Sequence, residues 1–339
     1  MDISFGELIC HKDFHDTFKA LQEANVNSFD QGARDLDLNH DILTSSEYKI
    51  EYVTQDIHPA DLSSGEKFVH DNIKRICGYD ESTFKYEALE GSLSLTSHSF
   101  VILDDHDWIP ANLLSTHFVT GSKKVAQKND LLVYSEDPSV YLKKKYADER
   151  QHLLTTYAQE KTILFIDGPI LSDNMNTFTI NTIEALEEIG VTPIFFVKNS
   201  YSKLVTDSIE ELKGQYNSDI HWLSSKLKKN QFSNWFKYTD QKNSRFSKVF
   251  CYYKPYIGFS PQRIEMYPIT YAKNEDRMEE LLNAISYLMI ANGDKSNPQI
   301  RPIAIAEKFA RETKKHVNIH DKLKSAGLVP TMNQERGFN

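Results

Sequence analysis

Cysteine is scarce in this sequence, and the familiar metal and nucleotide motifs are absent. The 339 residues contain three cysteines, which are far apart: Cys10, Cys77 and Cys251. An odd, scattered set argues against a disulfide framework and fits a reducing compartment. There is no C-x-x-C pair, no H-E-x-x-H and no G-x-x-x-x-G-K-[ST]. The sequence therefore excludes zinc sites of those types and a P-loop ATPase.

Long hydrophobic runs are also missing. No stretch approaches 18 uncharged apolar residues, the length that a membrane-spanning helix needs. The first residues, MDISFGELICHKDF, lack the basic and apolar regions of a signal peptide. We therefore expect a cytoplasmic protein without a membrane segment.

Positive charge is in deficit. Lys and Arg number 39 against 48 Asp and Glu, and the net charge is −9. An acidic chain binds polyanions poorly, so a nucleic-acid role needs a local basic surface or a partner that delivers the strand. Residues 221–254 hold eight Lys or Arg against the single acid Asp240. The aromatic residues interleaved there either stack on unpaired bases or pack into the core: Trp222, Phe232, Trp235, Phe236, Tyr238 and Phe246.

The hydrophobic patterns predict a mixed α/β fold, a mixed sheet flanked by helices. TILFI (162–166) and TPIFFVK (192–198) are apolar enough for buried strands, and a helix is predicted over 176–190 between them. Strand, helix and strand in this order indicate a parallel βαβ unit that is covered on both faces. Further elements are predicted on either side: helices over 13–25, 63–79, 137–161, 278–293 and 301–315, paired strands within 83–103, and strands over 247–259 and 262–270.

Four acids adjoin strongly apolar sequence. Asp167 ends the first buried strand, where sites gather in α/β sheets. Glu149 shares a helix stripe with apolar residues, a costly place for an unpaired carboxylate. Glu90 lies in the turn E-G-S, and Glu307 lies within PIAIAEKFA. Each also has a structural interpretation, as a turn cap, a buried ion pair or a solvated side chain.

A set of carboxylates alone suits Mg²⁺ or Mn²⁺, which prefer oxygen ligands. Such ions can activate water and stabilise the leaving oxygen of a phosphodiester. Lys198 and Arg263, each beside a predicted strand, are candidates to bind the phosphate. We therefore expect the four carboxylates to converge on bound metal.

Taken in order, several segments resemble those of the NurA nucleases: KYEALEGSL, the helix with Glu149, FIDGPIL, FFVKNSYSKLV, QRIEMYP and RPIAIAEKFAR. The resemblance implies an RNase H-like nuclease domain over 81–320, after a helical N-terminal region over 1–80 and before a C-terminal tail over 321–339. It further implies manganese-dependent cleavage of DNA, both endonucleolytic and 5′-to-3′ exonucleolytic. It also implies that the protein forms a homodimer and works with a HerA-like hexameric ATPase translocase in DNA end processing or anti-phage defence.

The resemblance also implies residue roles. Asp167 matches the aspartate of the second motif and Glu149 the helix acid, whereas Glu90 stands where the family has the aspartate of D-G-S. Glu307 stands where the family has histidine or aspartate. Lys198 follows FFV, and Arg263 opens RIEMYP. The two departures keep a second hypothesis open, a non-catalytic, DNA-gripping scaffold subunit of a translocase complex. A third hypothesis is an RNase H-like enzyme that acts on RNA.

Overall fold

The chain divides into two units, Met1–His40 and Asp41–Asn339. The structure, a computed structural model, describes residues 14–24, 45, 47–54, 56–72, 74–104, 107–172, 175–198, 200–256, 258–291, 298–315 and 317–328. In the first unit the described element is the helix α1 (Phe14–Glu23). All other elements belong to the second unit.

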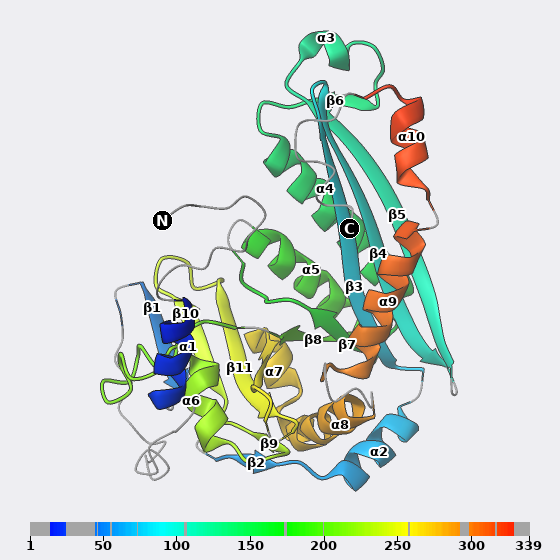
Figure 1. The fold of residues 1–339 in the computed structure, drawn as a ribbon. Coiled ribbons are helices and arrows are strands. Elements are labelled where there is room, and N and C mark those ends of the chain that lie inside the picture. Colours follow the sequence, from blue (N-terminus) through cyan, green and yellow to red (C-terminus); the bar gives the residue numbers. More distant parts are fainter. Residues whose placement is uncertain are drawn as a thin grey trace, which may run out of the picture. The chain divides into compact units, whose positions relative to one another are not determined.

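One mixed sheet of twelve strands organises the second unit (Figure 1). Its centre is β7 (Ile163–Asp167), which pairs in parallel with β3 (Ile76–Ala88) on one side and with β8 (Thr192–Val197) on the other. Antiparallel strands continue beyond β8: β12 (Gln262–Met266), β11 (Ser247–Lys254), β10 (Phe236–Asp240) and β1 (Tyr48–Tyr52). Beyond β3 lie β4 (Gly91–Asp104), β5 (Asp107–Thr120) and β6 (Leu132–Tyr134), while β9 (Gln231–Phe232) joins β11 to β2 (His58–Pro59). The predicted mixed α/β sheet is confirmed.

Helices cover both faces of the centre. The helices α4 (Pro138–Tyr157) and α5 (Asn176–Glu188) lie on one face, where Ile166 of β7 is buried with Leu153 and Ile183. On the other face, Phe165 is buried with Ile285 of α8 (Met278–Ile290) and Ile303 of α9 (Arg301–Lys315). Covering on both faces explains the continuous apolar runs of β7 and β8. The remaining described helices are α2 (Leu62–Asp71), α3 (Lys123–Ala126), α6 (Asp219–Lys226), α7 (Pro268–Lys273) and α10 (Ile319–Ser325).

The helices of the described ranges include none with the length and apolar character that crossing a membrane requires.

The N-terminal 80 residues differ from the expected helical region. They contribute β1, β2 and the start of β3, so the expected boundary after residue 80 falls inside β3. The pattern YKIEY of β1 buries Ile50 alone, and its partner β10 lies almost 190 residues further along the chain. The end of the C-terminal tail, residues 329–339, lies outside the described residues.

Gly78 lets α9 approach the sheet closely. A Cβ built on Gly78 would lie 2.4 Å from the carbonyl carbon and oxygen of Pro302, in the first turn of α9. Backbone atoms cannot move aside as a flexible side chain can. Because Gly78 is in β3, this contact sets the height of α9 above the sheet.

We expect Gly78→Ala to lower the free energy of unfolding by roughly 1–3 kcal/mol, because the added methyl group overpacks this contact. Denaturant unfolding measures the change. Gly121→Ala is the matched control, since a Cβ there meets no atom within 4 Å. Equal effects of the two substitutions would contradict the packing argument.

Candidate functional site

Polar side chains gather where the central parallel strands end. Asp167 is the last residue of β7, and Lys198 directly follows β8. In β3, Asp80 follows Tyr79, which is paired with Ile166 in the parallel register. Side chains alternate along a strand, and Phe165 and Phe196 are buried on the α8/α9 face. Asp167 and Lys198 therefore point toward that face, and Asp80 joins them because Tyr79 is buried on the opposite face.

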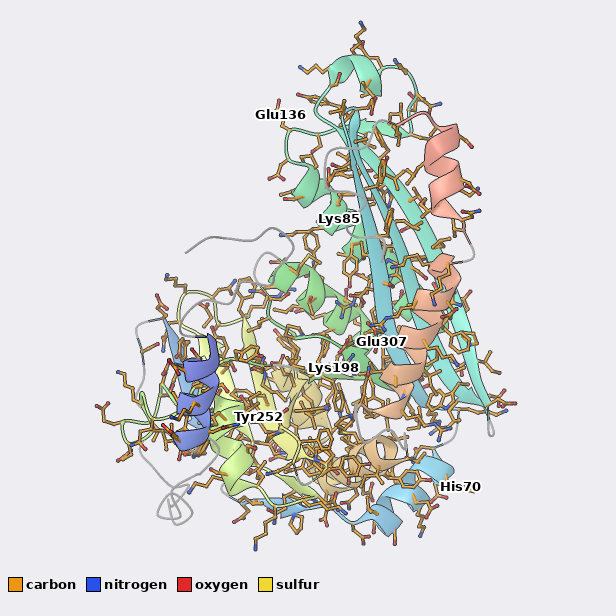
Figure 2. All side chains as sticks on the ribbon, viewed as in Figure 1. His70, Lys85, Glu136, Lys198, Tyr252 and Glu307 are labelled. Atoms are coloured by element: carbon orange, nitrogen blue, oxygen red, sulfur yellow. The ribbon has the colours of Figure 1, made fainter. Side chains whose placement is uncertain are left out.

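The helix α9 completes the group with Glu307. The ammonium group of Lys198 lies 3.0 Å from Oδ2 of Asp167 and 3.3 Å from Oε2 of Glu307. Figure 2 shows Lys198 at the end of β8 beside Glu307 on α9. Glu307 also accepts a hydrogen bond of 3.1 Å from Gln299 and pairs with Arg311, one turn along the helix. We call Asp80, Asp167, Lys198 and Glu307 the carboxylate cluster.

Burial makes the negative charge of this cluster costly. Asp80 is only 6% exposed, and burial, together with the charge of Asp167, raises its pKa to about 8. Burial also raises the pKa of Asp167, although Lys198 opposes the change. Burial lowers the pKa of Lys198, but Asp167 and Glu307 outweigh it, so its net shift is upward. Three carboxylates thus lie around the partly buried ammonium group of Lys198, and the site favours further positive charge.

The donors of this cluster fit a hard divalent cation. Asp80, Asp167 and Glu307 offer carboxylate oxygens, the ligands that Mn²⁺ and Mg²⁺ prefer. Ser99 is paired with Asp80 across β3 and β4, and its buried Oγ has no hydrogen-bond partner among the described residues. Within the described ranges no three His, Cys, Asp or Glu side chains are already gathered at metal-ligand distances. In this arrangement Lys198 bridges Asp167 and Glu307.

Asp80 is the acid that sequence reasoning missed, and Glu90 was expected in its place. Glu90 lies in the turn between β3 and β4, whose last pair is Ala88 with Gly91. Ten residues of extended strand separate it from Asp80, or roughly 30 Å. The structure therefore corrects the expected grouping of Glu90 with Asp167. The overlooked signal was the apolar stretch I-C-G-Y before Asp80, which begins β3 seven residues earlier than predicted.

Glu149 also lies apart from the cluster. Its carboxylate accepts hydrogen bonds from Nε2 of His117 at 2.6 Å, Oγ of Ser115 at 2.7 Å and Nε2 of His98 at 3.3 Å. Nδ1 of His98 in turn is hydrogen-bonded to the hydroxyl group of Tyr79 on the α4/α5 face, opposite Asp80. Burial by itself raises the pKa of Glu149, but His98, Ser115 and His117 outweigh it and lower the pKa to about 2. The expected convergence of Glu149 with Asp167 is therefore corrected too.

Arg263 is buried in an ion-pair network below the site. Its Nε lies 2.7 Å from Oε1 of Glu265, and its guanidinium donates to Oγ of Ser202 at 2.6 Å and to Oγ of Ser200. Oε2 of Glu265 accepts a hydrogen bond of 2.8 Å from the backbone N–H of Ile170. The network thus ties together the loops that follow Asp167 and Lys198. The structure makes Arg263 a positioning residue rather than one directed at the carboxylate cluster.

The basic segment 221–254 does not offer its aromatic rings for stacking. Four of them are buried in the core: Trp222, Phe232, Trp235 and Phe236. Tyr238 is partly buried and stacks on Tyr48 of β1. The core interpretation therefore holds for these four aromatic residues.

We expect Glu149→Gln to lower the free energy of unfolding by roughly 2–3 kcal/mol at neutral pH, because hydrogen bonds to a charged acceptor are lost. The folded-state pKa of Glu149, about 2, lies below its unfolded value. Its stabilisation is therefore present above roughly pH 4.5 and is lost as pH falls toward about 2. Chemical unfolding of both proteins across this range measures the difference, which should shrink with falling pH. A difference that does not change with pH would contradict the assigned role.

No protein-family model and no curated protein sequence matches the chain. Solved structures do. The NurA nuclease from Sulfolobus solfataricus superposes with a TM-score of 0.52 at 11% identity, over 94% of this chain and 98% of that one. A structure of NurA with manganese has a TM-score of 0.45 at 9% identity, over 88% and 93%. Endonuclease V from Bacillus subtilis has a TM-score of 0.42 at 10% identity, over 78% and 88%.

The likeness to the Sulfolobus protein extends over nearly the full length of both chains. At an identity of 11%, this likeness concerns the fold alone. The protein therefore has a mixed α/β fold like that of the Sulfolobus solfataricus NurA nuclease, as the ordered motifs predicted.

Proposed function

We propose that the protein is a metal-dependent DNA nuclease, a phosphodiester hydrolase, with the carboxylate cluster as its active site. The observation that supports this most is the position of Asp80 and Asp167, side by side on adjacent parallel strands, with Glu307 facing them from α9. Their oxygens would hold Mn²⁺ or Mg²⁺. A cation there would neutralise the charge of Asp167, which raises the pKa of Asp80, and that of Glu307, which raises the pKa of Asp167.

The chain's own residues have distinct tasks in this proposal. A bound divalent ion supplies an activated water and stabilises the leaving oxygen. Lys198 carries its positive charge between Asp167 and Glu307, where it can contact a non-bridging oxygen of the phosphate. Burial raises the pKa of the Asp80 carboxyl group to about 8, so a bound divalent ion would take the place of its proton. The proposal leaves Glu90, Glu149 and Arg263 outside the reacting group.

The finer features follow the resemblance to NurA. We propose a homodimer that works in the cytoplasm with a HerA-like hexameric ATPase translocase, in DNA end processing or anti-phage defence. Cleavage would be endonucleolytic and 5′-to-3′ exonucleolytic, with manganese as the first metal to test. The net charge of −9 supports dependence on a partner that delivers DNA.

We expect Asp80→Asn and Asp167→Asn each to reduce cleavage of linear duplex DNA in Mn²⁺ by about 100-fold or more. Calorimetric titration should show the loss of a Mn²⁺ site in both variants. Glu90→Gln is the matched control and should cleave at the wild-type rate, because Glu90 lies far from the cluster.

Measurements of stability distinguish a role of Asp80 in the active site from a purely structural role. A buried carboxyl group with a raised pKa contributes stability at low pH that is lost as pH rises through about 8. At pH 8 in chelator, Asp80→Asn should therefore unfold at the same temperature as the wild type or higher. Wild-type protein that cleaves no DNA with Mn²⁺, even beside its translocase, would favour the scaffold hypothesis instead.

A further inference from the structure

The solvent-facing side of α9 carries a row of positive charge. The exposed cations Arg301, Lys308, Arg311 and Lys315 follow one another at intervals of 7, 3 and 4 residues. These intervals keep them on one side of a helix. Two acids adjoin this side: Glu312, which pairs with Lys315, and Glu307, which pairs with Arg311. We call the four cations the α9 basic row.

Ordinary helix electrostatics does not account for the whole row. Positive charge in the last turn, where Lys315 lies, is favoured by the helix dipole. Arg301 lies in the first turn, where the dipole disfavours a cation. Lys308 occupies the middle of the helix, where the dipole has little effect. The row therefore extends along the full length of α9, in a chain whose net charge is −9.

Arg311 connects the row to the carboxylate cluster. Its guanidinium pairs with Oε1 of Glu307, while Oε2 of the same carboxylate lies 3.3 Å from Lys198. The side chain of Arg311 is nevertheless 65% exposed. A ligand that lies along the basic row would thus reach Lys198 and Asp167 at one side of the helix.

We infer that the α9 basic row binds the sugar-phosphate backbone of DNA and guides the strand to the carboxylate cluster. This inference rests on the proposed function and specifies where the substrate lies. A helix of 15 residues is roughly 22 Å long. Phosphates of one strand follow at about 3.4 Å along the duplex axis, so α9 is long enough to lie beside roughly six of them.

The row is better placed for this role than the basic segment 221–254. Most aromatic residues of that segment belong to the core, and its Arg245 is paired with Glu184 of α5, on the face opposite the cluster. The α9 basic row lies instead on the helix that supplies Glu307. The alternative ligand for the row is an acidic protein surface. If the row binds such a surface, removal of its charges should leave DNA binding unchanged.

The test removes three charges of the row and leaves Arg311 in place. The full-length triple variant Arg301→Gln, Lys308→Gln, Lys315→Gln is compared with wild type for binding to a fluorescein-labelled DNA duplex, by anisotropy in EDTA at several KCl concentrations. The slope of log K against log[salt] is negative. We expect it to be less steep in the variant, with its magnitude smaller by roughly 2–3, since each lost phosphate contact removes about 0.9. The affinity at 100 mM KCl should fall by about tenfold or more.

The matched control is Lys228→Gln, Lys229→Gln, Lys242→Gln, which removes equal charge from exposed positions of segment 221–254. Its salt slope should stay within about 0.5 of wild type, because no phosphate contact is lost. Three results would each overturn the inference. The row variant and wild type could have equal salt slopes, both variants could lose equal affinity for DNA, or the wild-type protein could bind no DNA at 50 mM KCl.

Binding in EDTA needs no catalysis, so this result is separate from that of the proposed function. A reduced slope in the row variant, together with undiminished cleavage by Asp167→Asn, would support the binding row and refute the proposed active site. Loss of cleavage in Asp167→Asn with an unchanged slope in the row variant would do the reverse. Circular dichroism and thermal unfolding of the triple variant exclude loss of fold as the cause of weaker binding.

Discussion

Burial of two neighbouring carboxyl groups, almost complete for Asp80 and partial for Asp167, determines the electrostatics at the end of the sheet that holds the carboxylate cluster. Asp80 and Asp167 are held side by side because β3 and β7 pair in parallel with Tyr79 opposite Ile166. Both side chains are on the same face of the sheet because this register fixes the face of each strand residue. Burial raises both pKa values, the charge of Asp167 adds to the rise for Asp80, and the ammonium group of Lys198 offsets part of the negative charge. A buried excess of negative charge destabilises the fold but favours the binding of a cation.

Packing on each side of the sheet supports this arrangement. Gly78 lets the backbone of α9 approach β3 closely, which places Glu307 over Asp167 and Lys198. Below the site, the buried pair Arg263 and Glu265 holds the loops after β7 and β8 through hydrogen bonds to their backbone and hydroxyl groups. An ion pair buried this deeply adds little net stability but fixes geometry. Its effect here is to restrain the two loops that carry the site.

The opposite face shows how differently a second buried acid can be treated. Glu149 receives three side-chain hydrogen bonds, and its pKa falls to about 2. Asp80 receives no comparable set, and its pKa rises to about 8. The contrast separates a carboxylate that holds α4 to β4 and β5 from one whose charge is left to be neutralised by a ligand. Both acids are next to apolar sequence, so the sequence pattern could not distinguish them.

Local sequence determined the central strands, their helices and three members of the cluster. Apolar runs identified β7 and β8, and chain order placed Asp167 and Lys198 at their ends, because parallel strands covered on both faces need continuous apolar residues. The periodicity of α9 located Glu307. Only tertiary structure decided which further acid joins them. The pairing of β3 with β7, more than 80 residues away, brings Asp80 rather than Glu90 into the carboxylate cluster. Glu149 lies outside the cluster because α4 packs on the opposite face of the sheet. Register and face depend on partners distant in the chain, and no local pattern contains them.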